Sequence, residues 1–182
     1  MSIGQRARSA ELEVSRAVFS PAVCKKIARR AVPAAITKCD DRNWLHPLSY
    51  GTLNYQGRYT RQQLPTPAYL TPIINQLDEE FPPDLTETTV LRVRTYRTGY
   101  HFEGGHLDST CDLRKIAVIA GSGWFVYRPQ LSTPSSAIEE PVSTGDVITL
   151  DNTDPALKLF HHAVPNPDIA LLIYGKAAPT ET

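Results

Sequence analysis

The stretch on which the rest of the interpretation depends covers residues 95–108, TYRTGYHFEGGHLD. It ends in His106-Leu107-Asp108, and alternate residues of a strand point to the same side. His106 and Asp108 can therefore present an imidazole and a carboxylate to one point. Together with a distant histidine they would form the 2-His-1-carboxylate set that binds non-haem Fe(II) with positions left open. The H-x-D pattern is short, so other features of the chain have to support it.

Length and charge narrow the class of protein. The 182 residues are enough for one domain with a proper core. The 19 basic and 19 acidic residues cancel, so no basic field predicts nucleic acid or an anionic membrane as a partner. No segment approaches the roughly 20 apolar residues of a membrane span.

The cysteines and the N-terminus indicate the compartment. The sequence begins MSIGQRARSAELEV and lacks an apolar signal core there. Cys24, Cys39 and Cys111 are odd in number, and Cys24 falls on an expected buried helix face. Free thiols in a reducing compartment, by default the cytoplasm, are therefore expected.

The N-terminal part, residues 11–83, is expected to be helices and loops behind a loose tail at 1–9. Alternation over 11–19 predicts a half-buried strand. Ser20-Pro21 and Thr71-Pro72 each provide a cap and a proline that can begin a helix. The two apolar faces are Cys24, Ile27, Ala28 and Ala31, and Ile73, Ile74, Leu77 and Phe81.

The segment between these helices, residues 33–65, is irregular and rich in Asn, Gly, Tyr and Arg. Such segments serve as substrate loops, or they contain strands with a weak pattern. Residues 40–63 are the expected substrate lid.

After residue 84 the apolar period changes from 3.6 to 2, which predicts a β-rich core over 84–176. The expected strands cover 89–95, 114–119, 124–128, 147–150, 157–164 and 169–174. Trp124 and Tyr127 are expected to fill the core. Two helices followed by six or seven strands predict one domain of the α+β class, mostly β.

A third metal ligand has to come from elsewhere in the chain. The candidates are His46, His101, His161 and His162. The last two follow Asp108 by about 55 residues, in LKLFHHAVPNP. Two neighbours on a strand cannot face the same side, so only one of the pair can be a ligand.

The sequence resembles the 2-oxoglutarate/Fe(II) oxygenase superfamily, in particular its prolyl-4-hydroxylase-like branch. VFSPAVCKKIARRAV resembles the opening strand and helix, and TYRTGYHFEGGHLD resembles the strand with H-x-D. LRKIAVIAGSGWFVYR resembles the next two strands, and GDVITLDN followed by HHAVP resembles the closing half. These matches cover most of 11–30 and 84–174 in the same order, and the middle third has none.

The resemblance implies a double-stranded β-helix, or jelly roll, with Fe(II) held by His106, Asp108 and His162. His162 is preferred over His161 because Val164 follows it by two residues, as in the family's His-x-Val. It further implies 2-oxoglutarate and O₂ as co-substrates. The implied reaction oxidises a C–H bond of a small molecule, an amino acid or a peptide.

One feature of the family is missing. There, an Arg or Lys about ten residues after the distal histidine binds the far carboxylate of 2-oxoglutarate, whereas this chain has Leu172. A buried carboxylate without a cation is costly, so another anchor is needed. Arg128 and Arg94 are the first candidates. Arg94 shares its predicted strand face with Arg92 and Tyr96, and Tyr96 matches a family tyrosine that looks into the barrel.

Two other functions stay open. The missing anchor favours an Fe(II) enzyme that binds its substrate directly at the metal and uses no 2-oxoglutarate. A metal-free binding module is the third reading.

Overall fold

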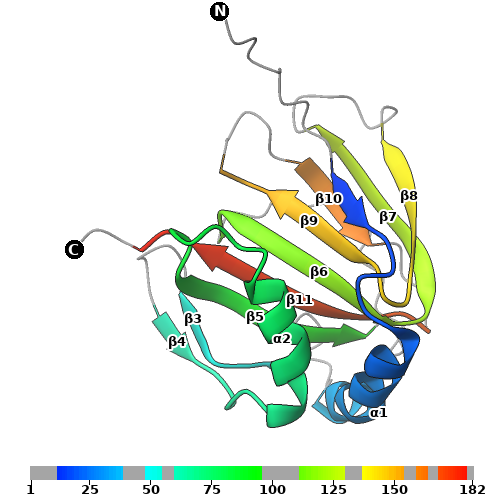
Figure 1. Cartoon of the computed structure of the whole chain (residues 1–182), viewed down its shortest axis with the longest axis horizontal. Helices are drawn as coiled ribbons and strands as arrows, with labels where there is room; N and C mark the ends of the chain where they lie inside the picture. Colours follow the sequence, from blue (N-terminus) through cyan, green and yellow to red (C-terminus); the bar gives the residue numbers. More distant parts are fainter. Residues whose placement is uncertain are drawn as a thin grey trace, which may run out of the picture.

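The computed structural model describes residues 12–38, 48–54, 60–95, 111–129, 137–153, 159–163 and 168–179. These residues form two α-helices, one short 3₁₀ helix and strands of two main sheets (Figure 1). The elements in chain order are β1 (Glu13–Ser15), α1 (Pro21–Lys38), β2 (Leu48–Ser49), β3 (Thr52–Asn54), β4 (Thr60–Gln62), η1 (Ala68–Leu70), α2 (Thr71–Asp78), β5 (Glu87–Thr95), β6 (Leu113–Ala120), β7 (Ser122–Pro129), β8 (Ile138–Ser143), β9 (Val147–Asp151), β10 (Leu159–Ala163) and β11 (Ala170–Ala177).

The strands alternate between two antiparallel sheets. The large sheet has the order β1-β9-β6-β11-β5-β2, and the small sheet has the order β10-β7-β8. The chain therefore passes from β6 into the small sheet at β7, returns to the large sheet at β9, enters the small sheet again at β10 and ends in the large sheet at β11. The β3-β4 pair forms a separate two-stranded sheet, and β3 lies close to β5 of the large sheet. This topology is the predicted double-stranded β-helix, with the predicted helices outside it.

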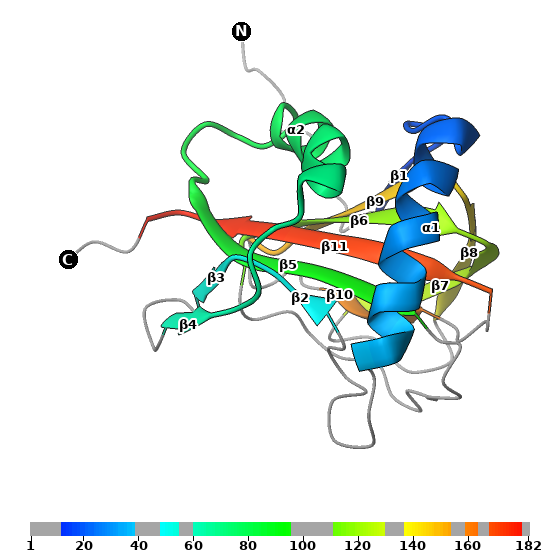
Figure 2. The same ribbon diagram turned by 90° about the horizontal axis from the view of Figure 1, so that it is seen from below.

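Helix α1 begins where the sequence predicts. The Oγ of Ser20 accepts a hydrogen bond from the N–H of Val23 at 3.3 Å, and Pro21 occupies the first turn. The predicted stripe is buried, with Cys24 and Ala31 fully covered. Figure 2 shows α1 crossing β5, β6 and β11 of the large sheet.

The helix does not end at Pro33, where the sequence predicts an irregular segment, but continues to Lys38. A proline inside a helix loses one backbone hydrogen bond and costs about 3 kcal/mol. Val32 and Ala35, on either side of Pro33, are buried in the core under the helix. Packing against the sheet therefore outweighs the local preference.

The two faces of the large sheet belong to two different cores. Leu91 and Val93 of β5 pack with α1 and α2, whereas Val90 of the same strand packs between the two sheets. On β11, Leu172 and Tyr174 lie on the helix side, and Leu171 and Ile173 lie on the inner side. The inner side of the large sheet is the one that any site inside the jelly roll would use.

Some strands were not predicted. β8 has the sequence IEEPVS, which lacks a clear apolar alternation, and most of its residues are exposed. A strand signal is therefore absent from this part of the sequence. The segment 33–65, predicted as a lid or as weakly patterned strands, contains β2, β3 and β4. Because β2 pairs with β5 through Leu48 and Ser49, part of this segment extends the large sheet.

Candidate metal and cosubstrate site

The predicted metal ligands are only partly within the described residues. His106, Asp108 and Tyr96 lie outside them, and so does Cys39. Within the described ranges, no group of three His, Cys, Asp or Glu side chains could hold a metal ion. Strand register and the side chains that face the interior of the jelly roll therefore indicate where a site would lie.

The register of β10 distinguishes the two candidate distal histidines. β10 pairs with β7, so that His161 lies opposite Tyr127 and His162 lies opposite Val126. Directly opposite residues of an antiparallel pair occupy the same face of the sheet. The two histidine positions therefore belong to different faces of the small sheet.

The side chains of β7 identify which face is the inner one. Phe125 is buried in the core between the sheets, and Tyr127 packs against that core. Trp124, with Val126 on the same face of the strand, has 47% of its surface exposed. Position 161 consequently shares the inner face with Tyr127, and position 162 shares the outer face with Val126. The prediction that Trp124 fills the core is wrong, because its strand position faces outward, whereas the prediction for Tyr127 is confirmed.

Two arginines lie on the inner side of the large sheet. Arg92 and Arg94 alternate along β5 with Leu91 and Val93, which pack on the helix side. Arg94 is directly opposite Leu171 of β11, an inner-core residue. The sequence prediction that Arg92 and Arg94 share one strand face is confirmed, and that face is the inner one.

The last strand provides no inner cation among its described residues. Leu172, which stands where the family's anchor is expected, is fully buried on the helix side. Lys176 is on the helix side as well: its Nζ lies 2.5 Å from Oδ1 of Asp78 and 5.4 Å from the centre of the Phe81 ring. The inner positions are Leu171 and Ile173, so the missing anchor has no substitute on β11.

Arg128, the other predicted anchor, is placed differently from Arg94. It lies on β7 two residues from Val126 and four from Trp124, on the face opposite Phe125 and Tyr127. By strand alternation this is the outer face of the small sheet. The arrangement brings Arg94 to the interior and leaves Arg128 outside it.

Sequence reasoning did not single out Arg114 as an interior residue. It is 6% exposed and lies on the same strand face as Ile116 and Val118, which belong to the inner core. Its strand neighbour on β11 is Gly175, where a Cβ would approach Cγ1 of Val90 to 2.6 Å. The inner space is thus tightly packed at this end, roughly 13 Å along β6 from the row of Arg94 and Leu171. The alternation Arg114, Ile116, Val118 was the signal that could have revealed it.

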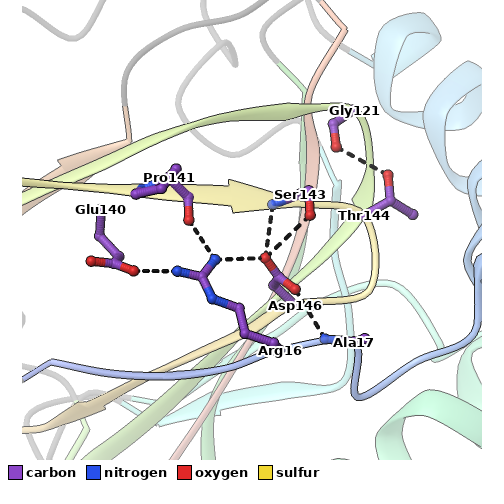
Figure 3. Close-up of polar contacts among 8 residues, drawn as sticks. All are labelled: Arg16, Ala17, Gly121, Glu140, Pro141, Ser143, Thr144 and Asp146. Atoms are coloured by element: carbon purple, nitrogen blue, oxygen red, sulfur yellow. Dashed lines mark hydrogen bonds and ion pairs between the residues drawn. The ribbon is translucent and has the colours of Figure 1, made fainter.

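A polar cluster fixes the turn between β8 and β9 (Figure 3). Asp146 accepts hydrogen bonds from the N–H of Ala17 at 3.0 Å, from the N–H of Ser143 at 2.9 Å and from Arg16 at 2.9 Å. Arg16 also binds Glu140. Burial alone would raise the pKa of Asp146, but the hydrogen bonds and the Arg16 charge outweigh it and lower the pKa. The carboxylate is therefore structural, joining the N-terminal segment to the jelly roll.

Comparison with known proteins gives structural likeness only. No family model matches the chain, and no curated protein sequence matches it. The structure titled "The structure of OsALKBH1" matches with a TM-score of 0.57 and 12% identity, covering 94% of this chain and 98% of that one. A 2OG-Fe(II) oxygenase family protein from Burkholderia pseudomallei matches at 0.47 and 16%, covering 72% and 67%. A viral collagen prolyl hydroxylase from Paramecium Bursaria Chlorella virus-1 matches at 0.46 and 11%, covering 92% and 96%.

The first of these likenesses agrees with the strand topology described above. The chain has the double-stranded β-helix fold of the 2-oxoglutarate/Fe(II) oxygenases, as its sequence predicts. None of the helices within the described residues is long and apolar enough to cross a membrane.

Proposed function

We propose that this protein is a non-haem Fe(II) oxygenase that uses 2-oxoglutarate and oxidises a C–H bond of its substrate. The observation that carries the proposal is the position of Arg94, on the inner face of the jelly roll and directly opposite Leu171. The family's anchor comes from the last strand, and here the neighbouring strand offers a cation beside the same place. The fold and the H-x-D tripeptide support the same activity.

His106, Asp108 and one histidine of the 161/162 pair would hold the iron. The sequence alone favours His162, whereas the strand register favours His161, because position 161 lies opposite Tyr127, which packs against the inner core. An imidazole, a carboxylate and a second imidazole suit Fe(II) and leave positions for other ligands. When bound, Fe(II) would supply the redox chemistry that couples decarboxylation of the keto acid to substrate oxidation.

Arg94 would bind the far carboxylate of 2-oxoglutarate. A guanidinium presents two parallel N–H donors to the two oxygens of a carboxylate, which fixes orientation as well as charge. Leu171, directly opposite Arg94, is buried and apolar, as is Val118 beside Leu171 on β6, and such an apolar wall would strengthen the ion pair. Arg92, two residues earlier on the same face, adds positive potential behind it.

The substrate proposed from the sequence is a small molecule, an amino acid or a peptide side chain, and O₂ is the second co-substrate. Residues 40–63 remain the proposed lid, although β2 shows that part of this segment belongs to the large sheet. The proposed location is the cytoplasm.

The alternative enzyme would bind its substrate directly at the iron without 2-oxoglutarate. The reason for this alternative is the missing anchor on the last strand. The inner position of Arg94 weakens that reason, because Arg94 could bind the keto acid instead. A metal-free module predicts that His106→Ala and Asp108→Ala leave the iron content unchanged.

The test is anaerobic titration of the Fe(II)-loaded protein with 2-oxoglutarate, followed by the weak visible charge-transfer band of a keto acid chelated to iron. Saturation of the band supports the proposal. Iron binding without the band supports the alternative enzyme, and absence of iron binding supports the metal-free module.

A further inference from the structure

A groove of about 520 Å³ lies on the helix side of the large sheet, between α1 and the turn that joins β6 to β7. Its floor is apolar and includes Ala28, Val32, Ile119 and Ala120. This surface is separate from the inner face that carries Arg94, because α1 packs on the opposite side of the sheet.

Both walls of the groove are held in place by buried or hydrogen-bonded residues. On the helix wall, Cys24 and Ala31 are fully buried against the sheet. On the opposite wall, the carbonyl of Gly121 accepts hydrogen bonds from the N–H and Oγ1 of Thr144 at 2.9 and 3.0 Å (Figure 3). Gly121 has φ +74°, and a Cβ there would lie 2.4 Å from the carbonyl oxygen of Asp168. A preformed groove of this kind binds a partner without a large ordering cost.

The rim of the groove is positive. Lys25 and Arg29, one helical turn apart, both line it and are exposed. Neither forms an ion pair with a residue that the structure describes. Helix α1 has no acidic residue between 21 and 38 that could neutralise them. Lys26 and Arg30 are not among the residues that line the groove, and Arg30 lies 5.8 Å from the centre of the Tyr69 ring. The nearby carboxylate of Asp146 is already bound by Arg16, Ala17 and Ser143.

We infer that the groove binds an acidic peptide segment of a partner protein, with an apolar side chain on the floor and carboxylates against Lys25 and Arg29. Opposite charge at the rim would give orientation, and burial of the apolar side chain would give affinity. Single-stranded nucleic acid is the weaker fit, because its bases need aromatic platforms and the described lining residues include no aromatic side chain.

The experiment measures fluorescence anisotropy of a short labelled peptide in which two leucines lie between pairs of glutamates. Lys25→Glu and Arg29→Glu are each expected to weaken binding by about three- to tenfold, the range of an exposed ion pair that is turned into repulsion. The matched control is Lys26→Glu, which makes the same change of charge one residue away but does not line the groove. It is expected to change the affinity by less than about twofold, since salt screens exposed charges.

Three outcomes would overturn the inference. Equal losses for Lys25→Glu and Lys26→Glu would mean a diffuse charge effect, and equal binding of a peptide with serines in place of leucines would remove the role of the floor. Tighter binding of a labelled single-stranded oligonucleotide would identify a different class of partner. Ala28→Phe, which fills the floor without changing charge, should reduce peptide binding while circular dichroism confirms that the variant is folded.

Discussion

The two faces of the large sheet carry cations in different settings. On the helix side the cations are lysines, and their partners come from α2 and the residues just after it. The Nζ of Lys115 lies 2.5 Å from Glu80, and that of Lys176 lies 2.5 Å from Asp78. Both lysines also approach the ring of Phe81, at 5.8 and 5.4 Å. These lysines hold the second helix region on the sheet.

On the inner side the cations are arginines. Arg92, Arg94 and Arg114 alternate with residues of the helix-side core and share their face with Leu171 and Ile173. Arginine keeps its charge in an apolar setting and binds planar carboxylates through two donors, whereas lysine is a compact point charge. The difference teaches that one sheet uses lysines for packing on the helix side, and that its inner side carries arginines, the cations on which the proposed keto-acid site depends.

The largest expected effect concerns the small sheet, which also has an inner and an outer face. Positions 161 and 162 belong to these two different faces. His161→Ala should abolish iron retention, because position 161 shares the inner face with Tyr127 and would supply the third ligand. His162→Ala is the matched control and should retain iron close to the wild-type level. Metal analysis of the purified, Fe(II)-loaded variants measures iron per chain. The opposite result would restore the preference for His162 and contradict the register argument.

The next expected effect tests whether the inner arginines bind the keto acid. Arg94→Leu should weaken 2-oxoglutarate binding by about 30- to 5,000-fold, since removing one partner of a buried charge pair costs about 2–5 kcal/mol. Arg128→Leu, on the outer face of β7, should leave binding nearly unchanged. The charge-transfer titration under anaerobic conditions gives both affinities.

A double variant makes this test sharper. In Arg94→Leu/Leu171→Arg the cation moves to the directly opposite residue on β11, the strand that provides the anchor in the family. Keto-acid binding should return in part. If Arg94→Leu binds normally, or if the Arg128 variant loses binding instead, the assignment of the inner face to 2-oxoglutarate is wrong.

A third variant tests the helix side alone. Leu172→Ala removes a fully buried side chain from the core between the helices and the sheet, and should lower the free energy of unfolding by about 2–5 kcal/mol. Because Leu172 faces away from the interior, keto-acid affinity should be unchanged at a temperature where the variant is folded. Urea denaturation and the titration, carried out on the same preparation, separate stability from binding. A loss of keto-acid affinity without a loss of stability would mean that Leu172 faces the interior, and would contradict its position on the helix side.

The sequence predicted the fold class, the start of α1 at its cap Ser20 and the position of Arg92 and Arg94 on one strand face, because a capping residue and strict alternation are local signals. Helix α2 also begins at the predicted Thr71-Pro72, but its N-cap residue is Leu70 and no side chain caps it. It could not predict which face looks inward. Residues 169–174 of the last strand are apolar on both faces, so their pattern does not distinguish Leu171 from Leu172. The continuation of α1 through Pro33 and the exposed strand β8 depend on packing partners far along the chain. The metal ligands His106 and Asp108 and the adjacent Tyr96 remain predictions, since they lie outside the described residues.

The smallest expected effect concerns Asp146, a buried charge whose partners are all structural. Its lowered pKa means that the folded state binds a proton at this group less readily than the unfolded state, whose aspartates titrate near pH 4. The stabilisation is therefore complete above about pH 4 and is lost as the pH falls through the lower pKa of the folded state.

Asp146→Asn should cost about 1–3 kcal/mol at neutral pH, because hydrogen bonds with a charged acceptor become weaker or are lost. Below pH 4 the difference between the variant and the wild type should shrink, which thermal unfolding as a function of pH measures. A constant difference across this range would mean that the carboxylate contributes through shape and not through charge, and a loss of keto-acid binding in this variant would show that the division between structural and ligand-binding charges is incomplete.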